Sequence, residues 1–146
     1  VVNPSTSTGL AELAASEGAD LIVFGSDYRT PPGRVEPGVA AQGLLDSGSV
    51  AIAVAAAGLR TDPSAAIATV SVAGEPGGAA ATTAQSVVSA LGAALLEGRG
   101  DADLILVDSR ASAPEGRMGL DGATRARLES ARGSVVVLPR GVALTF

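Results

Sequence analysis

Residues 19–45 read ADLIVFGSDYRTPPGRVEPGVAAQGLL, and this stretch decides the fold that the sequence predicts. An apolar run over residues 21–24 predicts a buried strand, which stops at Gly25. A loop with three prolines follows, and Gly38 opens an Ala-rich segment that predicts a helix over residues 39–45. Strand, glycine-containing loop and helix in this order are typical of open α/β sheets, in which small ligands bind beyond the carboxyl ends of parallel strands.

The same stretch occurs twice. Residues 102–110, ADLILVDSR, repeat residues 19–27, ADLIVFGSD, 83 positions later. An internal repeat of this kind predicts a duplicated α/β half-domain, so we expect a first unit over residues 1–60 and a second, shortened unit over residues 61–146. At the same offset of 83 positions, Arg34 matches Arg117 and Leu45 matches Leu128. The Gly-Ser-Val of residues 48–50 recurs at residues 133–135, two positions later than this offset predicts.

The order of the expected elements is that of a doubly wound, mostly parallel sheet with flanking helices. A short helix around Leu10 and Leu13 stops at Gly18, and Val1 and Val2 before it have the character of a strand's tail. Residues 58–65 are a linker by composition. The remaining strands are expected over residues 50–54, 67–72, 103–107 and 135–138, and the remaining helices over residues 80–97 and 121–131.

Composition excludes most catalytic chemistry. The chain has no His and no Cys, and all ten basic residues are Arg. This removes Ser-His-Asp triads, His or Cys metal sites, Schiff-base lysines and the phosphate-loop lysine, so we expect no catalytic residue and no metal site. A net charge of −5 disfavours nucleic acid as a partner. The longest apolar run, residues 50–57, is far too short to cross a membrane.

Several of the quoted residues resemble a known family. ADLIVFGS, Arg34, GVAAQGLL and the apolar strand after them are similar to the carboxyl half of the universal stress protein domain, a doubly wound nucleotide-binding fold. That family's pattern reads ADLIVVGS, a glycine-rich loop with an Arg, GSVAEELL and a strand such as PVLVV. The resemblance covers residues 10–55 and 102–140, and residues 67–78 resemble the family's first strand. It implies a cytoplasmic stress-response domain, and the Arg-only basic set suits a GC-rich bacterial genome.

The resemblance also implies a degraded ATP site. In nucleotide-binding members the phosphates lie on Gly, two residues, Gly, nine residues, Gly, and then Ser or Thr. The first copy keeps Gly25 and Gly38 but has Tyr28 and Val39 at the other two positions. The second copy keeps none of the four, and Ala73 stands where the family has an Asp that contacts base and ribose. The second-copy residues at the four positions are Asp108, Ala111, Asp121 and Gly122.

Elementary electrostatics supports the same conclusion. Asp108 ends a strand and Asp121 begins a helix, so two carboxylates border the place where an anion would bind. Each would repel a phosphate charge by roughly 4 kcal/mol at about 4 Å and intermediate dielectric. Asp121 is also a good N-cap, and we favour that structural role. Ser26 and Ser109 have no His or Lys in the chain to activate them, so a serine nucleophile is not expected.

Two functions remain open at this point. The first is a non-catalytic stress-response, regulatory or interaction module without a cofactor. The alternative is a nucleotide-binding domain that holds ATP or AMP with Mg²⁺ in the first-unit loop, residues 25–38. The residues that would bind the nucleotide are Gly25, Ser26, Gly33, Arg34 and Gly38.

The partner prediction concerns two short apolar strands. Residues 50–54 and 135–138 are each expected at the edge of a half-domain sheet, where an open apolar edge favours pairing. They can pair with each other, as an internal pseudo-dimer, or with a second copy in a homodimer. The chain starts without Met and without a full strand before its first helix. We therefore expect a piece of a longer protein, such as a tandem stress protein or a transporter with such a domain.

Overall fold

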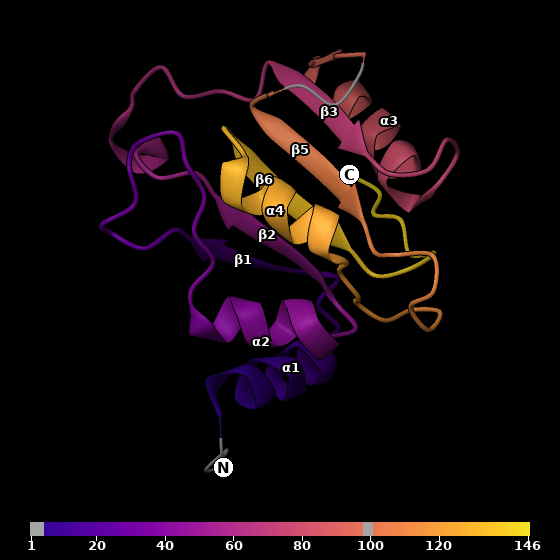
Figure 1. Ribbon diagram of the computed structural model, residues 1–146. Helices are drawn as coiled ribbons and strands as arrows, with labels where there is room; N and C mark the ends of the chain where they lie inside the picture. The colour runs from indigo at the N-terminus through magenta and orange to yellow at the C-terminus, as the bar shows by residue number, and fades with distance from the viewer. Residues whose placement is uncertain (1–4, 98–100) are drawn as a thin grey trace.

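The computed structural model describes residues 5–97 and 101–146, so the expectation for Val1 and Val2 lies outside the described residues. These ranges form an α/β fold with one six-stranded, mostly parallel sheet in the order β1-β2-β6-β5-β3-β4 (Figure 1). The strands are β1 (Leu21–Gly25), β2 (Ala51–Ala55), β3 (Thr69–Ala73), β4 (Ala94–Leu95), β5 (Leu104–Asp108) and β6 (Ser134–Leu138). The helices are α1 (Thr6–Glu17), α2 (Val39–Ser47), α3 (Ala79–Leu91) and α4 (Gly122–Ser130), with a 3-10 turn, η1 (Leu59–Thr61), in the linker.

One antiparallel pair joins the two repeats. β2 and β6 pair with each other in an antiparallel ladder, whereas the other strand pairs of the sheet are parallel. This internal pairing is one of the two arrangements that the sequence leaves open. Ala53 faces Val136, which is its own counterpart 83 residues later. A residue that pairs with its counterpart lies on a twofold axis, so the two repeats are related by a pseudo-twofold through the β2–β6 ladder.

The strand register also corrects the alignment of the repeats. Leu21 of β1 pairs with Ala51, and Leu104 of β5 pairs with Ser134, so both copies span 30 positions from strand to strand. Ala51 is therefore the counterpart of Ser134, at a distance of 83. The Gly-Ser-Val triplets, which are 85 positions apart, do not occupy equivalent places. Ser134 begins β6, whereas Ser49 precedes β2.

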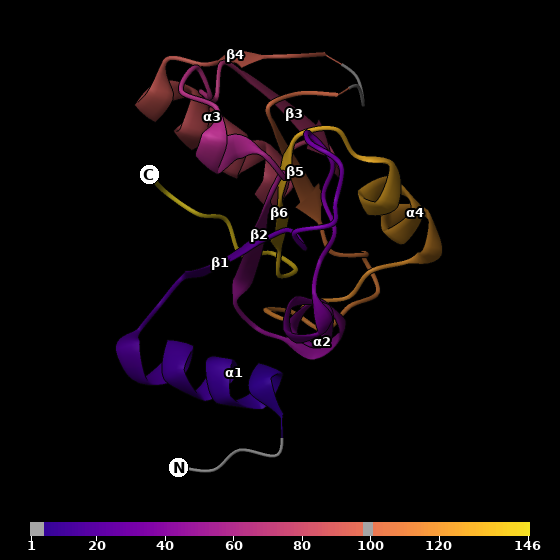
Figure 2. The same cartoon turned by 90° about the vertical axis from the view of Figure 1, so that its left-hand side faces the viewer.

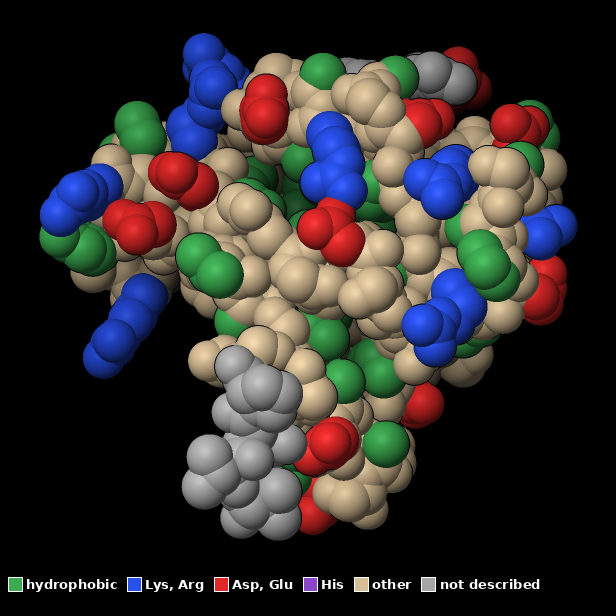
Figure 3. Space-filling view, turned by 60° about the horizontal axis from the view of Figure 1, so that its bottom comes forward, with side chains coloured by type: hydrophobic (Ala, Val, Ile, Leu, Met, Phe, Trp, Pro, Cys, Tyr) green, Lys and Arg blue, Asp and Glu red, His purple; other side chains and the backbone are tan. Residues whose placement is uncertain are grey.

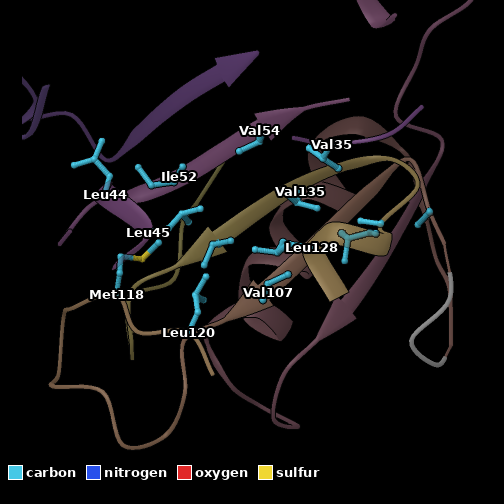
Figure 4. Packing of buried hydrophobic residues seen from close by; sticks show 14 residues of the cluster. Val35, Leu44, Leu45, Ile52, Val54, Val107, Met118, Leu120, Leu128 and Val135 are labelled. Atoms are coloured by element: carbon cyan, nitrogen blue, oxygen red, sulfur yellow. The ribbon is translucent and has the colours of Figure 1, made fainter. Parts of the chain in front are cut away.

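Two apolar layers cover the sheet. On one face, side chains of β2, β5 and β6 meet those of α2 and α4, and Figure 4 shows this packing around Leu45, Val135 and Leu128. On the other face, α3 packs against β3, β5 and β6 through its small residues Ala80 and Ala84. As expected from the composition, both layers consist mainly of Ala, Val, Leu and Ile.

The expected helix over residues 80–97 is wrong at its carboxyl end. α3 stops at Leu91 because Gly92 takes a left-handed conformation, with φ +65°, and its N–H caps the Val88 carbonyl. Ala94 and Leu95 then form β4, which pairs with β3 in parallel. Sequence favours helix through residues 93–97, and the single glycine overrides that preference because it admits the left-handed turn.

The first helix takes a different place from α3. α1 starts after the Ser5 N-cap and stops before Gly18, where the sequence predicts its end, and its main contact is with α2. Figure 2 shows α1 below the sheet beside α2, whereas α3 lies along the other end of the sheet. None of the helices in the described ranges has the length and hydrophobicity that a membrane span requires.

Candidate functional site

The hydroxyl of Ser26, in the candidate loop, links two segments of the fold through two hydrogen bonds, and we call this pair of bonds the serine crossbar. The hydroxyl donates to the Ala55 carbonyl at 2.7 Å and accepts the backbone N–H of Glu36 at 3.1 Å. It therefore ties the end of β2 to the loop that leads into α2. Its single proton is used within the fold, so a phosphate oxygen, which needs a donor, would have to displace the bond to Ala55.

The second repeat contains the same crossbar. Ser109 donates to the Leu138 carbonyl at 2.7 Å and accepts the N–H of Gly119 at 3.2 Å. Each of these residues lies 83 positions after its counterpart in the first repeat. Two copies with the same bonds, in a chain without His or Lys, indicate that these serines hold the loop in place.

Gly33 belongs to a turn that is also duplicated. Arg34 N–H donates to the Pro31 carbonyl at 3.1 Å, and Gly33 adopts φ +83° between them. In the second repeat Arg117 N–H donates to the Pro114 carbonyl at 3.0 Å, with Gly116 at φ +75°. The tetrapeptides PPGR and PEGR recur in the sequence at a distance of 83, and this match is the sequence signal that marks the turn.

Arg34 contacts the opposite repeat. Its guanidinium donates to the Glu129 carbonyl at the end of α4, at 3.2 Å. Arg117 makes the reciprocal bond, to the Ser47 carbonyl at the end of α2, at 3.1 Å. A cation at a helix C-terminus satisfies an unpaired carbonyl and opposes the negative end of the helix dipole. The two arginines therefore hold the repeats together across the pseudo-twofold.

Gly25 and Gly38 are the open positions of the candidate loop. Gly38 is the N-cap of α2 and makes no side-chain cap hydrogen bond, and a Cβ at either glycine would meet nothing within 4 Å. Tyr28, in the place of a phosphate-binding glycine, is 85% exposed, and its ring lies 5.2 Å from the Arg29 guanidinium. The start of α2 is thus the part of the candidate loop that is open to an anion.

The five candidate residues do not line one pocket. A hollow of about 800 Å³ lies beside the loop, between the linker and the ends of β2 and β6. Of the five, only Gly33 borders it, together with linker residues that include Asp62, two further aspartates, Asp101 and Asp103, and Arg132. The loop and this hollow do not form a common binding site for a phosphate.

In the second repeat, the counterpart of Gly25 is a carboxylate that occupies the N-terminus of α3. Asp108, at the end of β5, accepts the backbone N–H of Ala80 at 2.7 Å and also that of Glu75, so it sits on the N-terminus of α3. A Cβ added at Gly74 or Gly78 would collide with this carboxylate. Burial raises the pKa of Asp108, although the two backbone hydrogen bonds oppose the rise. The glycines of this strand-to-helix loop make room for a side chain of the protein itself.

Asp121 has the structural role that its position in the sequence favours. Its carboxylate accepts the N–H of Thr124 at 2.8 Å and caps α4. The hydrogen bonds from Thr124 lower the pKa of Asp121. The carboxylate therefore takes the helix N–H that a bound phosphate would otherwise use.

The described residues form no metal centre, and the face in Figure 3 has no basic patch. Within residues 5–97 and 101–146, no group of three or more His, Cys, Asp or Glu side chains could hold a metal ion. On the face that Figure 3 shows, Arg side chains are interspersed with Asp and Glu side chains, without a continuous basic area. One such contact is the ion pair between Arg125 of α4 and Asp46 of α2, which also bridges the repeats.

Comparisons with family models, with curated proteins and with solved structures found no match for this chain. The resemblance to universal stress proteins therefore rests on the motifs of the sequence alone.

Proposed function

We propose that the chain is a divergent universal stress protein-like domain that acts in the cytoplasm as a non-catalytic regulatory or interaction module. The observation that carries this proposal is the position of Asp108. A phosphate at the N-terminus of α3 would have to replace this carboxylate, which already accepts the backbone N–H groups of Ala80 and Glu75. In the second repeat, a carboxylate of the chain itself thus occupies the helix N-terminus that a phosphate would use.

The first repeat supports the proposal in a different way. Arg34, the candidate cation for the phosphates, is bound to the C-terminus of α4, and Ser26 is bound to β2. A nucleotide at this loop would compete with bonds that hold the two repeats together. Two of the five residues that the resemblance assigns to binding, Ser26 and Arg34, thus already make bonds within the fold, which supports a structural role for them.

The test is a calorimetric titration of the chain with ATP, ADP and AMP in the presence of Mg²⁺, alongside a thermal unfolding series. We expect no heat of binding and no stabilisation up to millimolar nucleotide. A ligand at a hundredfold its dissociation constant adds about 2.7 kcal/mol of stability, so binding would be visible as a clear rise in Tm. A dissociation constant of millimolar or tighter would overturn the proposal.

One observation favours the alternative, nucleotide binding at residues 25–38. The α2 N-terminus has no side-chain cap, and Gly25 and Gly38 face open space. The sharpest variant is Gly38→Asp, because it gives α2 the carboxylate cap that Asp121 gives α4. If a nucleotide binds at this loop, Gly38→Asp abolishes the binding, and Arg34→Ala weakens it. Nucleotide affinity that neither substitution changes would exclude the loop as the site.

The oligomeric state stays a prediction. β2 and β6 each have a strand on both sides in the described sheet, so a homodimer that pairs either of them with a second copy would have to open that sheet. We expect the isolated chain to sediment as a monomer. A stable dimer would show that another surface associates.

A further inference from the structure

The two repeats cover the same face of the sheet unequally. Leu106 of β5 is completely buried beneath α3, whereas Val23, its counterpart in β1, is 65% exposed. Leu104 is buried, and its counterpart Leu21 is only half-buried. No helix in the described chain does for β1 what α3 does for β5, because α1 packs against α2 instead.

The uncovered face borders an apolar hollow. Its volume is about 310 Å³, and side chains from both repeats and the linker line it, including Leu21, Val23, Ala53, Leu59, Ile67 and Leu91. The flank of α3, with Val87, Ala90 and Leu91, forms one wall. Among the described residues that line it, Ser134 is the sole one that is not apolar, and none carries a charge. A charged ligand would lose its hydration here without compensation.

The outer edges of β1 and β5 also differ. β5 pairs on its outer side with β3, in parallel, with Leu104 opposite Val70. β1 ends the sheet in the described part of the chain, so its outer edge has no strand. An unpaired backbone edge beside an exposed apolar face is a template for an added strand.

We propose that this surface binds a strand–helix segment of another polypeptide, in the geometry of β3 and α3 on β5. The strand lies parallel to β1 on its free edge, and the helix covers Leu21, Val23 and Ala53 alongside α3. The pseudo-twofold supports this occupant because the equivalent surface of the second repeat binds such a unit within the chain. Phe146, at the end of a segment that bonds to Thr83 and Ser86 of α3, also lines the hollow, so the new helix packs against this segment as well as α3.

The same comparison defines the chemistry of the partner. Its strand alternates apolar residues, as Val70 and Val72 do towards α3. Its helix presents Ala and Val on the buried side, as α3 presents Ala80, Ala84 and Val87, because small residues let the helix approach the sheet closely. This inference rests on the proposed role as an interaction module, and it names the partner of that role.

The test uses a synthetic peptide with residues 66–92 of this chain as the probe, since that segment contains β3 and α3. We expect the peptide to bind the intact chain and to slow amide exchange in residues 21–25. Val23→Asp should weaken binding at least tenfold, because it places a charge under the helix. Val23 is exposed, so this substitution leaves the fold intact. Leu13→Asp on α1, at a residue 56% exposed and outside the hollow, is the matched control and should leave binding unchanged.

Three results would overturn the inference. One is the absence of binding, or binding that Val23→Asp does not weaken. Another is faster exchange in the chain's own residues 69–91, which would mean that the peptide replaces β3 and α3 on β5. The third is self-association of the chain without peptide that Val23→Asp abolishes, which would identify a second copy as the occupant. None of these results bears on nucleotide binding, so the titrations above test the parent proposal separately.

Discussion

The two repeats agree in the bonds that build a half-domain and differ in what they leave open. Both contain the serine crossbar, the Pro-x-Gly-Arg turn and the arginine that caps the opposite helix. They differ at the strand end, where the second repeat has Asp108 and the first Gly25, and at the helix N-cap, where the second has Asp121 and the first Gly38. They differ again on the sheet face, where Leu106 is covered and Val23 is not. The shared bonds identify the fold, and the differences show where a partner or ligand could act.

The first prediction tests the difference on the sheet face and has the largest expected effect. Leu106→Ala should lower the free energy of unfolding by about 2–5 kcal/mol, because it opens a cavity in the layer beneath α3. Val23→Ala at the equivalent position should change it by less than about 0.5 kcal/mol, because the side chain is already in water. Urea titration of both variants measures the difference. Equal losses would mean that β1 is covered in solution.

The second prediction concerns the serine crossbars. Ser109→Ala leaves the N–H of Gly119 without an acceptor in a buried place, so we expect a loss of about 1–3 kcal/mol. Ser26→Ala removes the same bonds at a half-exposed loop, where water can replace the hydroxyl, and should cost about 1 kcal/mol or less. Unfolding in urea again measures the pair. A larger loss for Ser26→Ala would contradict this ranking of the two loops.

The third prediction tests what the repeats share. Arg34→Ala and Arg117→Ala should each cost about 0.3–1 kcal/mol, because each removes a cation from a helix C-terminus. Hydrogen exchange reveals the reciprocity: Arg34→Ala should speed exchange at the end of α4, and Arg117→Ala at the end of α2.

Arg29→Ala is the control for the arginine pair. Arg29 lies in the same loop as Arg34, is exposed, and bonds to the neighbouring Tyr28. Its removal should leave exchange in both helices unchanged. Faster exchange in the helix of the same repeat, after either Arg34→Ala or Arg117→Ala, would show that the arginines do not cross the pseudo-twofold.

The fold is largely predictable because its signals are local. Residues 21–24 and 104–107 are apolar runs bounded by Gly or Asp, and such runs predict buried strands wherever they pack. The expected helix over residues 80–97 is wrong at its end because its last residues favour helix and a single backbone torsion at Gly92 ends it. The sequence leaves the pairing between β2 and β6 open because two short apolar strands give no signal that selects an internal partner over a second copy.

The candidate site is less predictable because its residues act through distant partners. Arg34 bonds to Glu129, which is 95 positions away, and Ser26 bonds to Ala55 at the end of another strand. A charged or hydroxyl side chain in a glycine-containing loop looks the same in a sequence whether it binds a phosphate or a carbonyl. The repeat itself holds the missing information, since PPGR and PEGR recur 83 residues apart without any common ligand motif.

The last prediction concerns the carboxylate at the N-terminus of α3 and has the smallest expected effect. Burial raises the pKa of Asp108 in the folded chain above its value of 3.8 in the unfolded chain, so the folded state binds this proton more tightly. The stability that the proton contributes is fully present below pH 3.8 and is lost as the pH rises through the folded pKa. Asp108→Asn cannot titrate, so its free energy of unfolding should depend less steeply on pH just above 3.8. Urea titrations of both proteins across that range measure the difference between them.

Gly25→Asp extends this experiment to the first repeat. It places a carboxylate at the position equivalent to Asp108, but the surroundings of Gly25 are open, and no neighbouring atom lies within 4 Å of the added Cβ. An exposed carboxylate keeps its ordinary pKa, so this variant should follow the pH dependence of the unmodified chain. If Gly25→Asp instead steepened the pH dependence in the way that Asp108 does, the two strand ends would be alike. The place beside Gly25 would then disfavour a negative charge, and the case for nucleotide binding at residues 25–38 would weaken.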